Sequence, residues 1–137
     1  MNISLKTPHE LQLMREAAVI LKSVQEKLKQ EIKDGVSLLA LDKIAEKIIL
    51  DAGATPSFKG YQGFPATLCT MVNSEVVHGI PDDRTVKTGD LLSIDCGVFW
   101  KGFHADAAFS VIVGGDEKDP ERAQFSRIVK EALLRGC

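Results

Sequence analysis

The stretch LLSIDCGVFWKGFHADAAFSVIV, Leu91–Val113, decides the fold because it carries two runs of strand-forming residues on either side of a turn. Lys101 and Gly102 suit a two-residue hairpin loop, since glycine tolerates the positive φ that such turns require. The stretch therefore predicts an antiparallel hairpin that carries one aspartate on each strand.

In this hairpin register, Asp106 lies opposite Gly97 and Asp95 lies opposite Ala108. Side chains alternate between the faces of a sheet, so both aspartates share one face as diagonal neighbours. Diagonal α-carbons are about 7–8 Å apart, which lets two carboxylates reach the same ion. Because Gly97 and Ala108 are small, we expect room beside the carboxylates for something other than a side chain.

A metal ion would explain why carboxylates stand in such apolar strands. Two unpaired carboxylates on a half-buried face repel each other, and each carries a desolvation cost of several kcal/mol. A divalent cation removes both problems, whereas a face open to water would not need one. Oxygen ligands favour Mg²⁺ or Mn²⁺, and an added histidine admits Fe²⁺, Co²⁺ or Zn²⁺. His104 is the nearest histidine on that face, although it could equally be a polar residue beside the turn.

Two amphipathic helices precede the hairpin. The first is predicted to begin at a capping box, Thr7–Glu10, and to stop at Lys33–Gly35. The second is predicted to run from a Ser37 cap to a glycine stop at Gly53. Both carry apolar residues at steps of three and four, so both are expected to be amphipathic.

The remaining segments complete an α/β (α+β) chain without an internal repeat. An irregular loop is predicted for 56–65, a strand for 66–72, and a loop with a brief extended piece for 73–90. A last helix should begin at an Asp119 cap with Pro120 behind it. We expect a single domain, 1–137, made of two helices, antiparallel strands and one helix.

Composition excludes several functional classes. The 137 residues are 45% hydrophobic and 26% charged, which is typical of a globular domain. The net charge of −2 and the absence of long like-charge blocks argue against a nucleic-acid partner or an anionic membrane. No apolar run reaches the roughly 18 residues that span a bilayer, and no signal peptide is recognisable, so we expect a cytoplasmic protein. Three cysteines at uneven spacing predict free thiols.

Four segments in this order and spacing resemble the N-terminal half of the type I methionine aminopeptidases: GYQGFP, VNSEVVHGIPDD, TGDLLSIDCGVFWKGFHAD and FSVIVG. Prolidases and Xaa-Pro aminopeptidases share an aspartate pair, but VVHGIPD is more similar to the methionine enzymes. The resemblance implies a pita-bread fold, removal of the initiator methionine from new polypeptides, and two divalent metal ions, which could be Co, Mn, Fe or Zn. It also implies that N-terminal methionyl peptides are the partners.

The resemblance assigns roles to particular residues. Asp95 and Asp106 match two metal ligands, and His78 matches a histidine that contacts the substrate near the scissile amide and stabilises the reaction's intermediate. The expected walls of the methionine pocket are Tyr61, Phe64, Cys69 and Phe58. From the residues alone, His78 could be a surface histidine and the pocket set could be ordinary core. His104 matches a histidine outside the metal ligands.

The family's other ligands, one histidine and two glutamates, are implied to lie in a C-terminal half that this chain lacks. No histidine follows His104, and the later acidic residues lie in a polar loop and an amphipathic helix. We therefore expect the isolated chain to be essentially inactive and to expose an apolar sheet with the carboxylate pair. We expect this face to be covered by a second half or, in the chain alone, by self-association. A non-catalytic peptide-binding module and a non-functional fragment remain alternatives.

Overall fold

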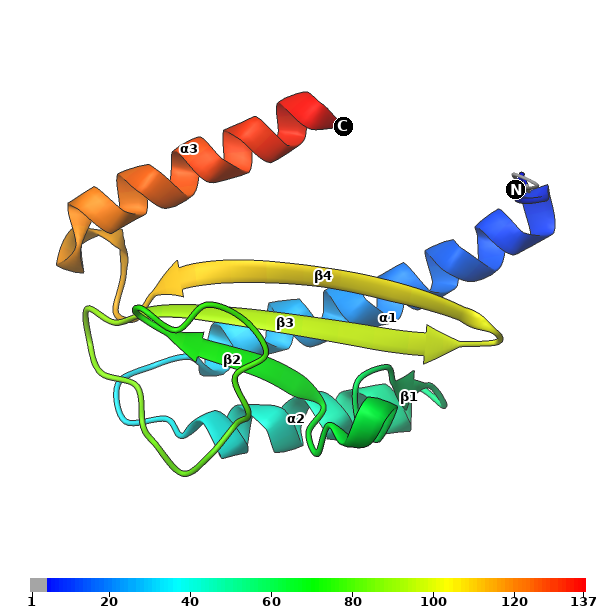
Figure 1. Ribbon diagram of the computed structural model, residues 1–137, viewed down its shortest axis with the longest axis horizontal. Helices are drawn as coiled ribbons and strands as arrows, with labels where there is room; N and C mark the ends of the chain where they lie inside the picture. The colour runs from blue at the N-terminus through cyan, green and yellow to red at the C-terminus, as the bar shows by residue number, and fades with distance from the viewer. Residues whose placement is uncertain (1–4) are drawn as a thin grey trace.

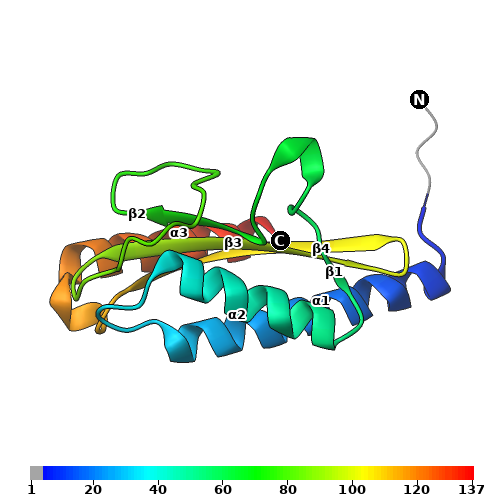
Figure 2. The ribbon, with the colours of Figure 1, turned by 90° about the horizontal axis from the view of Figure 1, so that it is seen from below.

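The computed structural model describes residues 5–137 as a four-stranded antiparallel sheet with two helices on one face. Helices α1 (Pro8–Glu31) and α2 (Leu38–Asp51) form that covering layer (Figures 1 and 2). Strand β3 is central: β4 pairs with one edge, and β1 and β2 share the other. The strands are β1 (Thr55–Pro56), β2 (Leu68–Val72), β3 (Leu91–Trp100) and β4 (Phe103–Ile112). The elements and their order match the expected α/β class.

The predicted hairpin is confirmed, including its register. Gly97 pairs with Asp106, and Asp95 pairs with Ala108. The turn residues Lys101 and Gly102 have φ of 46° and 90°, the positive values that a tight hairpin turn of this hand requires.

The predicted helix starts are confirmed as well. The side chain of Thr7 accepts from the backbone of Glu10, whose carboxylate accepts from the backbone of Thr7 at 2.7 Å. Ser37 caps α2, and Asp119 caps α3 (Pro120–Gly136) with proline in the first turn. The first two helices end at Glu31 and Asp51, each two residues before the predicted stop begins.

The core lies between β3 and the two helices. Alternate residues of β3, Leu92, Ile94, Cys96 and Val98, are fully buried against the helix layer. Apolar residues of α1 and α2 meet them, and the most deeply buried of these are Val24, Leu28, Leu38, Leu41 and Ile49. The other β3 face, with Asp95, is therefore the one turned away from the helices.

Two features differ from the sequence expectation. The segment expected to be a loop from Pro56 begins as strand β1, because the chain continues along the edge of β3 that β2 leaves free. The apolar sheet surface that was expected to be exposed is not found, because within residues 5–137 none of the large exposed apolar side chains belongs to a strand. Those of α3 are Phe125, Ile128, Val129, Leu133 and Leu134, each more than half exposed. Helix α3 buries only Ala123 and extends beside β4 (Figure 1).

All three cysteines are free, as predicted. Within residues 5–137, no helix combines the length and apolar character needed to cross a bilayer.

Candidate metal centre

Asp95 and Asp106 form an interacting carboxyl pair on the face of the sheet that the helices leave open. The pKa of Asp106 is raised to about 6, first by burial and then by the negative charge of Asp95 and a hydrogen bond between the two carboxyls; His104 opposes the rise. Asp106 remains exposed on one side, and water there screens part of the repulsion. A carboxyl pair that resists double ionisation fits a divalent cation, which would favour the fully ionised pair.

The raised pKa can be measured directly. In the metal-free chain, we expect the side-chain carboxyl of Asp106 to titrate near pH 6 in a carbon-detected NMR experiment. Because this pKa lies above the ordinary value, the group's contribution to stability is full below about pH 4 and is lost as the pH rises through 6. Asp95→Asn should lower the midpoint without restoring the ordinary value, since burial is the largest cause. Ser110→Ala is the control and should not move the midpoint. If Asp95→Asn also leaves the midpoint of Asp106 unchanged, the two carboxyls do not interact.

The space expected beside Gly97 is occupied, which corrects one sequence expectation. A β-carbon built on Gly97 would lie 2.7 Å from the β-carbon of Ser57 and 2.7 Å from Cε1 of Phe58. Glycine at this position therefore admits the segment after β1 and not a ligand. The open side of the pair is the one toward Ala108, which is exposed.

His104 already has polar and aromatic partners on this face. Its Nδ1 is 2.9 Å from the hydroxyl of Ser57, and its ring lies beside that of Phe99 at a tilt of 41°, with centroids 4.6 Å apart. Among residues 5–137, no group of three or more histidine, cysteine, aspartate or glutamate side chains is placed to hold a metal ion. The described chain thus offers two carboxylates that fit a cation and no complete ligand set.

Cys69 lies directly opposite Asp95 in the pairing of β2 with β3. It is almost fully buried, and burial, followed by the charges of Asp95 and Asp106, raises the pKa of its thiol to about 11. At neutral pH the side chain is therefore an uncharged, apolar thiol. Such a thiol suits the wall of an apolar pocket better than a thiolate ligand.

His78 lies in the exposed loop between β2 and β3, and this loop is anchored beside Cys69. The amide of Thr70 donates to the carbonyl of Gly79 at 2.9 Å. A β-carbon on Gly79 would come within 2.1 Å of the Thr70 carbonyl oxygen, so only glycine permits this approach. His78 itself has a φ of 57°, a left-handed value that is uncommon outside glycine. The backbone thus brings His78 to the strand next to the carboxylate pair.

The other expected pocket residues lie on the loop that follows β1. Phe58 is half-buried, Phe64 is half-buried, and Tyr61 is 68% exposed at the start of a short 3₁₀ turn, Tyr61–Gly63. The loop is closed by a hydrogen bond from the amide of Gly60 to the carbonyl of Phe64 at 2.8 Å. It stands above the face of the sheet opposite to the helices (Figure 2).

Asp42, a buried aspartate that was not predicted from the sequence, holds the start of β2 from the helix side of the sheet. Asp42 of α2 accepts from the backbone amides of Thr67 and Leu68 at 2.9 and 2.8 Å, which fixes the start of β2 just before Cys69. Burial raises the pKa of Asp42, while the two amide hydrogen bonds oppose the rise. Its position, between apolar residues of α2, is the sequence signal that could have identified it.

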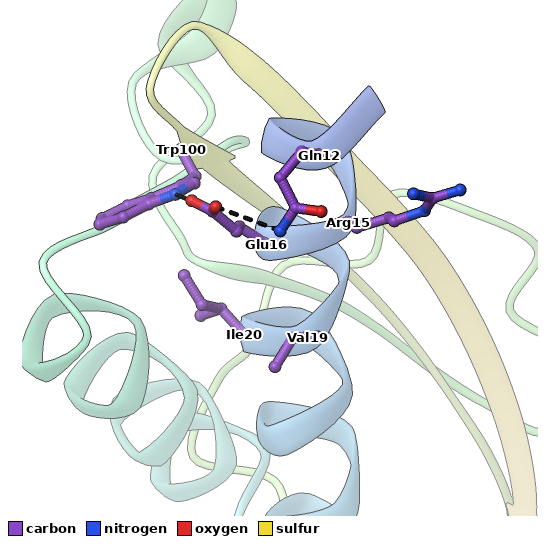
Figure 3. Close-up of a pocket in the computed structure, with 6 residues that line it drawn as sticks. All are labelled: Gln12, Arg15, Glu16, Val19, Ile20 and Trp100. Carbon is purple, nitrogen blue, oxygen red and sulfur yellow. Dashed lines mark hydrogen bonds between the residues drawn. The ribbon is translucent and has the colours of Figure 1, made fainter. Parts of the chain in front are cut away.

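A hollow of about 380 Å³ lies on the opposite side of the sheet, between α1 and the end of β3 (Figure 3). It is lined by Gln12, Arg15, Glu16, Val19, Ile20 and Trp100. The indole N–H of Trp100 donates to Glu16 at 2.9 Å, which ties the hairpin end to α1. None of the expected site residues contributes to it, so we assign this hollow no part in the candidate centre.

The chain matches the model of the metallopeptidase family M24 over residues 12–137. The chain belongs to this family. Members of family M24 are metal-dependent peptidases by description, which agrees with a carboxylate pair suited to a cation. The sequence expectation of a metallopeptidase is thereby confirmed at the level of the family.

Particular M24 relatives are methionine aminopeptidases. The chain is 46% identical to the methionine aminopeptidase of Clostridium perfringens over 134 residues, which are 98% of this chain and 53% of that protein. It is also 46% identical to methionine aminopeptidase 1 of Bacillus subtilis over 131 residues, 96% of this chain and 52% of that protein. The crystal structure of the Thermotoga maritima methionine aminopeptidase superposes with a TM-score of 0.90 at 32% identity, covering 98% of this chain and 53% of that one. The pita-bread fold is confirmed, and the chain spans about half the length of the relatives it matches.

Proposed function

We propose that this chain is the N-terminal half of a methionine aminopeptidase that removes the initiator methionine from new polypeptides in the cytoplasm. The observation that carries the proposal is the interacting carboxyl pair Asp95 and Asp106, set between buried Cys69 on β2 and the Phe58 loop. The 46% identity to methionine aminopeptidases across nearly the full chain favours methionine over proline specificity.

In this proposal Asp95 and Asp106 hold two divalent ions, which could be cobalt, manganese, iron or zinc. Bound ions supply a Lewis acid that activates water and polarises the scissile carbonyl. The pair's resistance to double ionisation is the property of this chain that favours the ions. The remaining ligands would come from a C-terminal half, because the described residues provide no third ligand beside the pair.

The side chains around the pair would bind and orient the substrate. His78 would donate a hydrogen bond to the carbonyl oxygen near the scissile amide, a position where developing negative charge needs a donor. Uncharged Cys69 and the aromatic rings of Phe58, Tyr61 and Phe64 would contact the methionine side chain. Sulfur and aromatic surfaces suit a thioether, because both are apolar and polarisable.

A chimera tests this function. Residues 1–137 joined to the C-terminal half of the Bacillus subtilis relative should release methionine from methionyl peptides whose second residue is small. An apolar pocket discriminates a single methylene by only about 1–3 kcal/mol, so N-terminal norleucine should also be accepted. The intact Bacillus enzyme is the positive control. Equal cleavage of peptides that begin with lysine or proline, or none of any peptide, would contradict the proposal.

We also propose a role for the apolar stripe of α3, defined here as Phe125, Ile128, Val129 and Leu133. These side chains recur at steps of three and four and leave more than half of their surface exposed, which is unusual for an isolated domain. In a longer protein the stripe would pack against the C-terminal half. In the chain alone it would drive self-association.

A further inference from the structure

Ser57, which is not a proposed ligand, makes two polar contacts beside the candidate centre. The amide of Ser57 donates to the carbonyl of Gly97 on β3 at 2.9 Å. The hydroxyl of the same serine lies 2.9 Å from Nδ1 of His104 on β4. Ser57 therefore joins the loop after β1 to both strands that carry the aspartates. Either the hydroxyl donates to the ring nitrogen, or a ring N–H donates to the hydroxyl.

The missing side chain of Gly97 makes this crossing possible. Ser57 and Phe58 lie where a β-carbon of residue 97 would project, with both contacts at 2.7 Å. Gly97 is the direct partner of Asp106 in the hairpin. The Phe58 ring is consequently held over the strand position beside Asp106, where it bounds the space above the carboxyl pair.

His104 is suited to hold Ser57 in this place. Its ring lies beside that of Phe99, its partner across the hairpin, with the centroids 4.6 Å apart and the rings tilted by 41°. The loop has a second anchor far from the carboxylates, an ion pair between Lys59 and Glu46 of α2 at 2.6 Å. Both members of that pair are partly exposed, so it should contribute little. The contact between Ser57 and His104 is thus the side-chain tie that, together with the backbone hydrogen bond from Ser57 to Gly97, sets the loop against the site.

We propose that His104 is a positioning residue: through Ser57 it holds the Phe58 loop against the carboxylate face and so sets one wall of the substrate site. The role in the substrate site rests on the function proposed above. The holding of the loop is independent of that function, because it depends only on contacts among residues 57–104.

Three variants separate the hydrogen bond from the rest of the His104 side chain. Ser57→Ala removes the hydroxyl, and His104→Phe removes the ring nitrogen but retains an aromatic ring against Phe99. His104→Asn keeps a polar atom near the position of Nδ1 and should restore part of the contact. Ser110→Ala is the matched control, since it removes another hydrogen bond between β3 and β4 on the same face, the 2.7 Å contact with Ser93.

In the 137-residue chain, exchange of the amide of residue 57, relative to the intrinsic rate for the residue present, should become about threefold to tenfold faster in Ser57→Ala and in His104→Phe, as expected for the loss of one hydrogen bond. In the double variant Ser57→Ala with His104→Phe, this amide should exchange no faster than in either single variant. Ser110→Ala should leave its exchange rate unchanged. In the chimera, KM for a methionyl peptide should rise by a similar factor with little change in kcat, because the wall contacts substrate and transition state alike. His104→Asn should recover part of the lost affinity.

An unchanged exchange rate of the residue 57 amide in both single variants would overturn the positioning role, regardless of the activity of the chimera. Faster exchange with an unchanged KM in an active chimera would overturn the link to the substrate wall. A chimera that cleaves nothing would contradict the proposed function, and the exchange measurement would still decide whether His104 holds the loop. If His104→Phe does not fold, Ser57→Ala carries both measurements.

Discussion

Replacing Asp95 or Asp106 by asparagine is expected to abolish specific divalent-ion binding in the chimera. Each substitution removes a charged oxygen that no other described residue can supply. Methionine release should fall by more than roughly a hundredfold, since losing a partner outside the ligand set already costs about 10–100-fold. Calorimetry with Mn²⁺ or Co²⁺ measures the first effect, and peptide hydrolysis measures the second.

The same variants should not destabilise the metal-free chain. Asparagine removes the repulsion between the two carboxyls, which after burial is the next cause of the raised pKa of Asp106, so thermal unfolding without metal should occur at an equal or higher temperature. Loss of ion binding together with unchanged or higher thermal stability distinguishes a lost ligand from a misfolded protein. Ion affinity unchanged in either variant would refute the assignment, and indifference of the parent chimera to both ions would favour a non-catalytic binding module.

The second large effect concerns the chain alone. We expect residues 1–137 to release no measurable methionine, to bind ions weakly and to self-associate through the apolar stripe of α3. Sedimentation should show dimers or larger species, and the double variant Ile128→Lys with Leu133→Lys should shift them to monomers, because charges on the stripe oppose its burial. Lys130→Ala, on the charged side of α3, is the control and should change nothing.

Joining the C-terminal half should reverse all three properties of the chain alone. The chimera is expected to be monomeric and active, since the added half covers the stripe and completes the ligand set. A stable monomer of the 137-residue chain that releases methionine at rates typical of enzymes would contradict this prediction. It would also show that two aspartates and His78 suffice for the chemistry.

Local rules explain why much of the fold could be predicted. The capping box at Thr7 and the turn at Lys101 and Gly102 depend on residues within a few positions of one another. The hairpin register follows from that turn, and side-chain alternation then places Asp95 and Asp106 together. These contacts needed no knowledge of the rest of the chain.

The errors arose where distant segments meet. Nothing near Gly97 in the sequence indicates that Ser57 and Phe58, about forty residues earlier, fill the space above it. Asp42 was missed because an aspartate within an amphipathic helix usually faces water, whereas here the strand start Thr67–Leu68 turns it inward. The periodicity of α3 identified an apolar side correctly, but periodicity does not say what covers it.

The hairpin also has a consequence for the order in which the centre assembles during folding. Both proposed ligands belong to strands joined by a two-residue turn, so bringing them together closes only a short loop of chain. Hairpins of this kind form in about 1–10 μs, whereas contacts that bridge distant segments, such as those of Ser57 with His104, are slower. The two carboxylates should therefore meet before the Phe58 loop settles over Gly97, and an ion present at that stage could act as a template for the face.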